Sequence, residues 1–259
     1  MSSAARKLMS ASGGGGGGDS AKAIAVAHNA FPYVTAYSWD VDNGFGANYS
    51  NPATLPTGDG NVVAFSPDSS AIAVSHFTSP FVSAYPWSGS GFGTKYSNPA
   101  TLPPNTGYGV AFSPDGSAIA VAHQTIPQVS AYPWSGSGFG TKYSNPATLP
   151  SNTSYDVAFS PDGSAIAIAH SISPFVSAYP WSGSGFGTKY SNPASLPAGT
   201  SFGVAFSPDS SVIAVAHDNS PYVAAYPWSG SGFGTKYSNP ATLPPDTGYS
   251  ADFSPDGAA

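Results

Sequence analysis

A unit of about 47 residues is repeated along this 259-residue chain, and this period constrains the fold more than any other feature. The five tryptophans and the five histidines recur at intervals of 47 or 48 residues: Trp39, Trp87, Trp134, Trp181 and Trp228, with His28, His76, His123, His170 and His217. A fixed period of this size indicates structural units that bury their apolar faces against neighbouring copies. The fold can therefore be predicted one unit at a time.

Each unit contains four strand-like segments between turn signals, which in residues 105–150 are 108–112, 118–123, 128–134 and 139–150. The first segment ends at a Ser-Pro-Asp-Gly turn, in which proline fixes φ and Gly116 accepts a positive φ. The second segment alternates alanine with Ile119, Val121 and His123, so it has one small and one large face. No helical spacing occurs in the unit.

Four short antiparallel strands in every unit are typical of a β-propeller blade. A linear stack of such units would expose two apolar ends, whereas a ring exposes none. The copies begin with a second strand at residues 23–28 and end with a first strand at residues 249–253. We therefore expect residues 21–259 to form an all-β, five-bladed β-propeller of four-stranded antiparallel blades, in which the C-terminal strand completes the N-terminal blade and closes the ring.

Composition excludes several classes of partner and chemistry. The net charge of -6 argues against a phosphate-binding surface, so we expect no nucleic acid partner. No apolar run approaches the ~20 residues of a membrane span, and the N-terminus has no apolar segment of the secretory type. Because the chain has no cysteine, it has no disulfide and no cysteine-ligated zinc.

The repeated histidine and aspartate do not form a pattern typical of a metal or catalytic site. One ion needs several histidine nitrogens within ~2.1 Å, whereas strands about 4.8 Å apart keep these imidazoles separate. The aspartates of the Ser-Pro-Asp turns occupy the acceptor position of an Asx turn, with no second acid at a fixed offset. No G-x-S-x-G elbow has an acid and a base within reach in the sequence. We expect no metal, no cofactor, no catalytic residue and no enzyme activity.

Two loop surfaces with different degrees of conservation between the copies are expected. In an antiparallel meander, the turns after the first and third strands share one face of the disc, and the loops after the second and fourth strands share the other. The first set is nearly identical between copies, with the sequences Ser-Pro-Asp-Gly or Ser-Pro-Asp-Ser and Trp-Ser-Gly-Ser-Gly-Phe-Gly. We call the surface that these turns form the constant face. The second set differs from copy to copy, and we call it the variable face.

The segment from Phe112 to Gly116, with Val129 to Tyr132 after it, resembles the blades of WD-repeat and related propellers, and this resemblance covers about residues 23–257. The Gly-His pair of true WD repeats is absent. Five blades of 47 residues also look like tachylectin-type propellers, which are five-bladed, bind sugars and have a similar turn, F-x-x-P-x-G. This second resemblance implies a lectin function.

Aromatic residues recur on or near the constant face and are the candidate glycan or partner surface. Sugar rings stack on such side chains, and weak sites gain from multivalency. The alternative is that these residues fill the gaps between diverging blades. The candidates are Trp87, Phe92, Tyr96, Trp134, Phe139, Tyr143, Trp181, Phe186, Tyr190, Trp228, Phe233 and Tyr237.

Residues 1–20 lie outside the repeat and contain six consecutive glycines, which predict a flexible arm. A short cationic and apolar segment, Arg6, Lys7, Leu8 and Met9, precedes the glycines. This arrangement resembles the start of some tailed-phage virion proteins, which implies docking on a virion protein lattice and a place on the virion surface or outside the cell.

Two functions are compatible with these features. The first is a non-enzymatic structural or display protein, a virion decoration or appendage protein that is anchored by its N-terminal arm. The second is a multivalent, lectin-like propeller that binds surface glycans.

Overall fold

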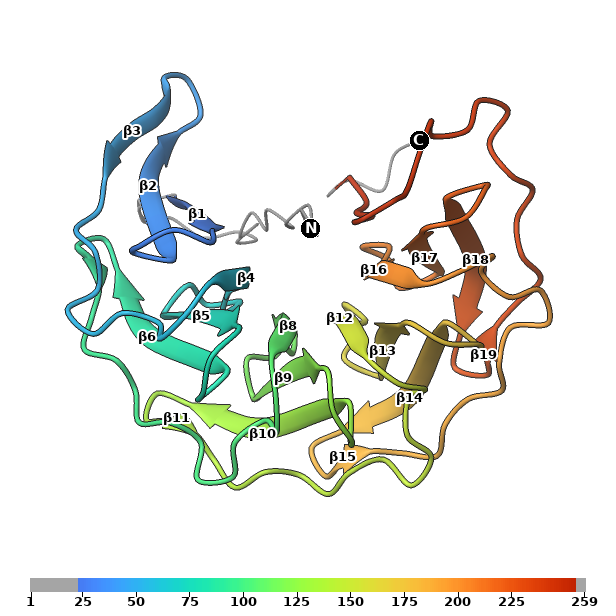
Figure 1. Cartoon of the computed structure of the whole chain (residues 1–259), viewed down its shortest axis with the longest axis horizontal. Coiled ribbons are helices and arrows are strands. Elements are labelled where there is room, and N and C mark those ends of the chain that lie inside the picture. The colour runs from blue at the N-terminus through green and yellow to red at the C-terminus, as the bar shows by residue number, and fades with distance from the viewer. Residues whose placement is uncertain (1–22, 255–259) are drawn as a thin grey trace.

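The computed structural model describes residues 23–254, whose regular structure consists of strands β1 to β19, with no helix among them (Figure 1). The strands form five antiparallel sheets arranged around a common axis, and we number these blades one to five in chain order. The predicted all-β, five-bladed propeller fold is confirmed. Because the described residues contain no helix, none of them forms a membrane-spanning helix.

The blades follow one another along the chain. Blade one consists of β1 (Ala23–Ala27), β2 (Val34–Asp40) and β3 (Gly44–Asn48). Blade two consists of β4 (Gly60–Phe65), β5 (Ala71–His76), β6 (Val82–Ser88) and β7 (Gly91–Phe92). Blade three consists of β8 (Gly107–Phe112), β9 (Ala118–His123), β10 (Val129–Ser135) and β11 (Gly138–Phe139). Blade four consists of β12 (Ser154–Phe159), β13 (Ala165–His170), β14 (Val176–Ser182) and β15 (Gly185–Phe186). Blade five consists of β16 (Ser201–Phe206), β17 (Val212–His217), β18 (Val223–Ser229) and β19 (Gly232–Phe233).

The turn between the first two strands of a blade is held by its own side chains. In blade three, the Ser113 hydroxyl donates to Asp115 Oδ1 at 2.6 Å and accepts from the Ala118 amide at 2.9 Å. The Ser117 amide also donates to Asp115, and Gly116 has a φ of 70°. These bonds hold the pKa of Asp115 below its ordinary value, the Ser113 bond having the largest effect. The aspartate is thus an acceptor within the turn, as the sequence predicts.

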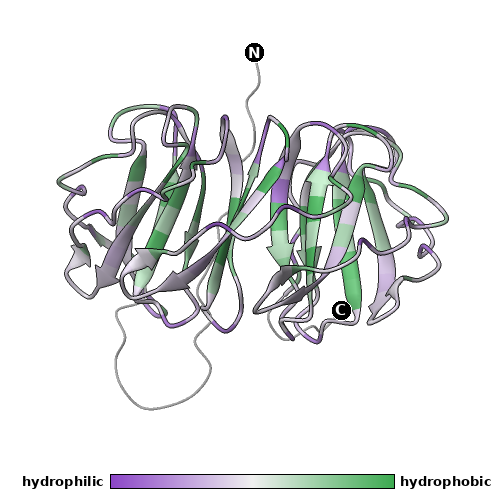
Figure 2. Ribbon diagram, turned by 90° about the horizontal axis from the view of Figure 1, so that it is seen from below, coloured by the Kyte–Doolittle hydropathy of each residue, from purple (hydrophilic) through white to green (hydrophobic). Residues whose placement is uncertain are grey.

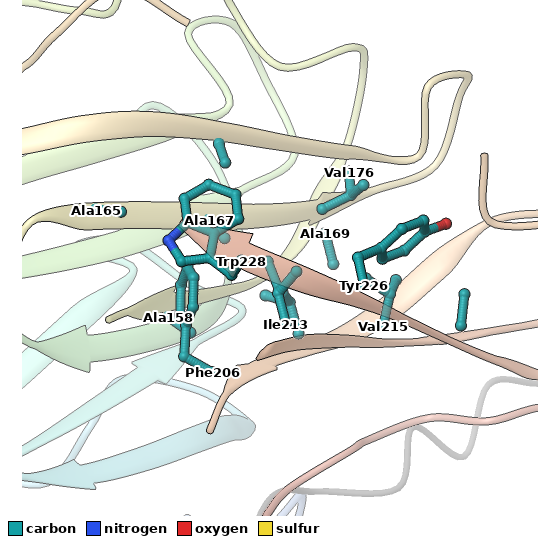
Figure 3. Packing of buried hydrophobic residues seen from close by; sticks show 13 residues of the cluster. Ala158, Ala165, Ala167, Ala169, Val176, Phe206, Ile213, Val215, Tyr226 and Trp228 are labelled. Carbon is teal, nitrogen blue, oxygen red and sulfur yellow. The ribbon is translucent and has the colours of Figure 1, made fainter. Parts of the chain in front are cut away.

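Neighbouring blades pack a small face against a large face. Between blades four and five, Ala165, Ala167 and Ala169 contact the face that carries Ile213, Tyr226 and Trp228 (Figure 3). Figure 2 shows that the hydrophobic residues lie along the strands, between the two surfaces that carry the loops. Because alanine and isoleucine or valine alternate in the second strand of every blade, the same pairing is repeated at each of the four interfaces.

A tyrosine hydroxyl ties most blades to the preceding one. Tyr132, Tyr179 and Tyr226 donate to the carbonyls of Thr101, Thr148 and Ser195 at 2.8 to 2.9 Å. The rings are fully buried, so these bonds satisfy groups that would otherwise be costly to bury. The interfaces are therefore fixed by polar as well as apolar contacts.

The ring is not closed by the C-terminal strand, which corrects the sequence-based prediction. Blade one has three strands, and residues 247–254 contain no strand. These residues lie against blade five: the Gly248 amide donates to the His217 carbonyl at 3.0 Å, and the Tyr249 ring lies 5.5 Å from that of Phe202. Figure 1 shows the resulting arc, with a gap between blade one and this segment. The four well-packed interfaces set the curvature of the arc and leave its ends apart.

Candidate ligand-binding site at the propeller axis

The four candidate tryptophans Trp87, Trp134, Trp181 and Trp228 are buried, with 6% to 8% of their surface exposed. Trp134, on β10, is surrounded edge-on by the rings of Tyr96, Phe112 and Phe139, at centroid distances of 5.1 to 5.2 Å. A sugar stacks on an aromatic face, and this packing covers the faces of the indole. The geometry gives these tryptophans a role in packing.

The remaining candidates fill the space around the tryptophans. Phe92, Phe139, Phe186 and Phe233 are half-buried and contact the tryptophan of their own blade. Tyr96, Tyr143 and Tyr190 contact the tryptophan of the next blade, at 5.1 to 5.3 Å. Tyr237, at the end of blade five, is 48% exposed. The structure thus brings the set together as filling between blades, with the exception of the exposed Tyr237, and a glycan role for the set stays a prediction.

The repeated histidines are held inside the blades. His76, His123 and His170 are fully buried, and their Nε2 atoms lie 3.0 Å from the hydroxyls of Ser83, Ser130 and Ser177. Burial lowers the pKa of each imidazole to about 4. Within residues 23–254, no three histidine, aspartate or glutamate side chains gather as metal ligands would. Residues 1–20, with Arg6, Lys7, Leu8 and Met9, lie outside the described residues.

A row of aromatic rings lies where the first strands of the blades meet near the axis. Tyr108, Tyr155, Phe202 and Tyr249 occupy the same position in successive repeats, and we call them the axial aromatic row. Their ring centroids are 5.2, 4.9 and 5.5 Å apart in that order, and the ring planes are tilted by 43° to 55°. The Phe77 ring lies 6.0 Å from that of Tyr108 and extends the row outward.

A β-bulge places each ring of this row that lies on a strand. The pairing of first and second strands shifts by one residue between Gly107 and Gly109, and Tyr108 is the extra residue. The same shift occurs around Tyr155 on β12 and around Phe202 on β16. A bulge re-aims a side chain out of the regular alternation of a strand. The rings therefore meet one another at the axis instead of packing between blades.

The row is accessible and lies at the variable face. Tyr108, Tyr155 and Phe202 are half-buried, and Tyr249 is 39% exposed. Burial raises the pKa of the Tyr108 and Tyr155 hydroxyls, and the nearby Asp218 carboxylate raises that of Tyr155 further. Both tyrosines therefore remain neutral near pH 7 and can donate or accept a hydrogen bond.

The loops after the second strands extend this surface with exposed apolar side chains. Phe31, Ile126 and Ile172 are 72%, 68% and 50% exposed, and Phe77 is 46% exposed. Each of these loops contains a cis proline, and the next residue has a φ between 67° and 72°, which is uncommon outside glycine. Exposed apolar groups on one side of a molecule mark an interaction surface. The variable face is therefore the better candidate for ligand contact.

The axial aromatic row is absent from the sequence-based predictions, although a signal for it exists in the sequence. Four of the five repeats have an aromatic residue at this position, and Asn61 replaces it in the remaining repeat. Asn61 instead donates from Nδ2 to the Gly107 carbonyl at 2.8 Å. The periodicity was visible in the sequence, but the bulge that turns these side chains toward the axis becomes apparent only from the strand register.

No protein-family model matches this chain, and no curated protein matches it. Among solved structures, it is similar to a "putative 6-phosphogluconolactonase" of Bacteroides uniformis, with a TM-score of 0.68 and 16% identity over 91% of this chain and 72% of the other. A second protein of that description, from Bacteroides fragilis, has a TM-score of 0.66 and 15% identity over the same shares. A protein of unknown function from Desulfotomaculum acetoxidans has a TM-score of 0.59 and 16% identity over 89% and 71%.

These matches correct the expectation of a chain without enzyme activity, because two of the similar structures are described as enzymes. The missing serine elbow and metal cluster exclude only the mechanisms that depend on them, and a propeller can support others. At 15% to 16% identity the likeness shows the fold alone. None of the three structures supports the resemblances to WD-repeat, tachylectin or virion proteins.

Proposed function

We propose that this propeller is a recognition module that binds a glycan at the axial aromatic row and the variable loops around it. The observation that carries the proposal is the placement of Tyr108, Tyr155 and Phe202 by β-bulges, side by side at an accessible face. Aromatic faces bind the apolar faces of sugar rings, and the tyrosine hydroxyls supply polar contacts at the same place. A row of rings suits an extended chain of sugar units better than a single one.

The site differs from the one that the tachylectin-type resemblance implies. In that scheme, equivalent clefts between blades each bind one sugar and gain affinity through multivalency. The tryptophans of those clefts are buried under other rings, whereas the axial row has exposed area. We therefore propose the same class of ligand, a glycan, but at the variable face instead of the constant face.

Glycan binding by the full chain should depend on the axial row. On an array of surface glycans, the Tyr155→Ala variant should bind about ten-fold more weakly than wild type, as is typical for removal of a central aromatic contact. The matched control is Ser182→Ala, on the exposed constant-face turn of the same blade, which should leave binding unchanged. A blank array for wild type, or equal losses in both variants, would contradict the proposal.

Anchoring by residues 1–20 is retained as a second part of the proposal, supported by the sequence alone. The cationic and apolar residues Arg6, Lys7, Leu8 and Met9 precede a glycine tract, which suits a tethered display of the disc on a virion lattice. Deletion of residues 1–20 should abolish incorporation into particles and leave glycan binding by the disc intact. Incorporation at the wild-type level would show that the arm is not the anchor.

A further inference from the structure

Each internal interface contains a tyrosine knob and a glycine notch. Tyr96 of blade two lies against Gly138 of blade three, where an added Cβ would be 3.1 Å from the tyrosine Cβ. Gly138 has a φ of 98°, which also favours glycine. The same arrangement joins Tyr49 to Gly91, Tyr143 to Gly185 and Tyr190 to Gly232. The tyrosine of one blade therefore fits the notch and the tryptophan of the next.

Blade one has an unfilled notch. Gly44 has a φ of 76°, like the other notch glycines, but an added Cβ there would meet only Trp39 of its own blade, at 3.9 Å. Phe45 beside it is 63% exposed. Ile24 and Val26 are half-buried, whereas the equivalent residues of the other blades are fully buried. The face of blade one that carries Ile24 and Val26 is therefore composed like the large face of an interface. No neighbouring blade packs on it among the described residues.

Blade five has the unpaired knob. Tyr237 is 48% exposed, whereas Tyr96, Tyr143 and Tyr190 are half-buried against the next tryptophan. The small face of blade five is also open, and its Val223 is half-buried and lines a cleft with Ala216 and residues 244–248. In blade four the equivalent Val176 is fully buried in the cluster that contains Val215 of blade five.

The C-terminal segment already lies where the first strand of a following blade would lie. The Tyr249 ring continues the axial aromatic row, and an added Cβ on Gly203 would be 2.8 Å from Ser250 Cα. An added Cβ on Gly109 is 2.9 Å from Asp156 Cα in the same way. Blade one, with strands equivalent to the second, third and fourth of the other blades, lacks only this first strand. The two ends of the arc are thus the two halves of one missing interface.

The curvature of the arc keeps these halves apart within one chain. In Figure 1 the five blades leave a gap in the arc between blade one and residues 247–254. Closing five blades into a ring would widen every angle between blades to about 72°. All four interfaces would have to repack, although their tryptophans are already buried.

We propose that the ends pair between two copies of this chain, with blade five and residues 247–254 of one copy packed on blade one of the other. Tyr237 then occupies the notch at Gly44 and covers Trp39, and Val26 fills the cleft at Val223. Residues 249–253 add the missing first strand to blade one of the second copy. The contact is heterologous, so it leaves one free end of each kind and can continue to longer assemblies. It does not depend on the glycan function.

Light scattering coupled to size exclusion tests the contact with two complementary variants of the full chain. Wild type should show a molar mass that rises with concentration from that of one chain, 26.1 kDa, to two-fold and above. Tyr237→Asp removes the knob and Val26→Asp disrupts the large face, so each variant alone should be a monomer. Their mixture keeps one intact end of each kind and should form a dimer that grows no further. A wild-type monomer at every concentration, or a mixture of folded variants without dimers, overturns the proposal.

Disulfide trapping separates pairing between copies from closure within one chain. The natural sequence has no cysteine, so Gly44→Cys combined with Tyr237→Cys gives the only two thiols. The matched control is Tyr96→Cys with Gly138→Cys, across an internal interface where the two Cβ positions are close enough for a near-native disulfide. Under oxidation the control should crosslink within the chain, and the end pair should give covalent dimers and larger species. An end pair that crosslinks only within the chain, or not at all while the control does, overturns the proposal.

Discussion

The free energy of unfolding should decrease steeply as the pH falls from about 6.5 to about 4. His76, His123 and His170 are buried, and burial lowers the pKa of each from an ordinary 6.5 to about 4. The unfolded chain therefore takes up protons in this range while the folded chain does not. The free energy of unfolding is therefore undiminished above pH 6.5. It decreases as the pH falls toward the folded pKa, by up to about 1.4 kcal/mol per pH unit for each histidine.

Nearby charges act in the same direction as burial. Lys95, Lys142 and Lys189 each lie near one of these histidines and lower its pKa, whereas hydrogen bonds to the backbone partly oppose this effect. Below about pH 4 the aspartates of the turns extend the loss. The hydroxyls of Ser207 and Ser211 hold the pKa of Asp209 at about 2, below its ordinary value of 3.8. The contribution of Asp209 to stability is therefore complete above pH 3.8 and disappears as the pH falls through 2.

Urea unfolding at half-unit steps from pH 4 to pH 7 measures this dependence. His123→Gln keeps a donor for Ser130 and removes one titrating group, so the slope of stability against pH should decrease by about 1.4 kcal/mol per unit. Ser135→Ala, on an exposed turn of the same blade, should keep the wild-type slope. Imidazole NMR signals of His76, His123 or His170 that titrate near pH 6.5 in the folded protein would contradict the argument.

The sequence predicts the blade well because the signals for the blade are local. The alternation of alanine with Ile119 and Val121 determines which faces pack, and the Ser113 and Asp115 side chains hold the turn whatever lies around them. The aromatic row was missed because the orientation of Tyr108 depends on a bulge in strand pairing. A bulge is a matter of register between strands, which the pattern of one strand does not determine.

The open arc could not be predicted from the repeat either. Counting the copies gives five blades, but the angle between blades depends on how side chains such as Tyr96 and Trp134 interlock. Small differences in the angle between blades add up over the four interfaces, so the sequence pattern alone does not decide whether the two ends of the arc meet. The exclusion of enzyme activity failed for a different reason: absent motifs say nothing about mechanisms that use other residues.

Trp134→Ala should destabilise the protein far more than Trp39→Ala, although the two tryptophans occupy the same position in their blades. Trp134 is 8% exposed and contacts three rings, so its removal leaves a cavity and should cost about 3–5 kcal/mol. Trp39 is half-buried and makes its one ring contact among the described residues with Phe45, so its removal should cost about 1–2 kcal/mol.

Urea unfolding of both variants at low protein concentration, where contacts between copies are minimal, measures the difference. Because repeat proteins can unfold in parts, hydrogen exchange should be followed as well, with protection lost in blades two and three for Trp134→Ala and in blade one for Trp39→Ala. The pair also separates the two roles considered for these residues. If Trp134→Ala keeps wild-type stability and loses glycan binding, the tryptophans are ligand contacts and the packing assignment is wrong. If it loses stability while any remaining folded protein binds as before, the tryptophans hold the blades together and recognition does not depend on them.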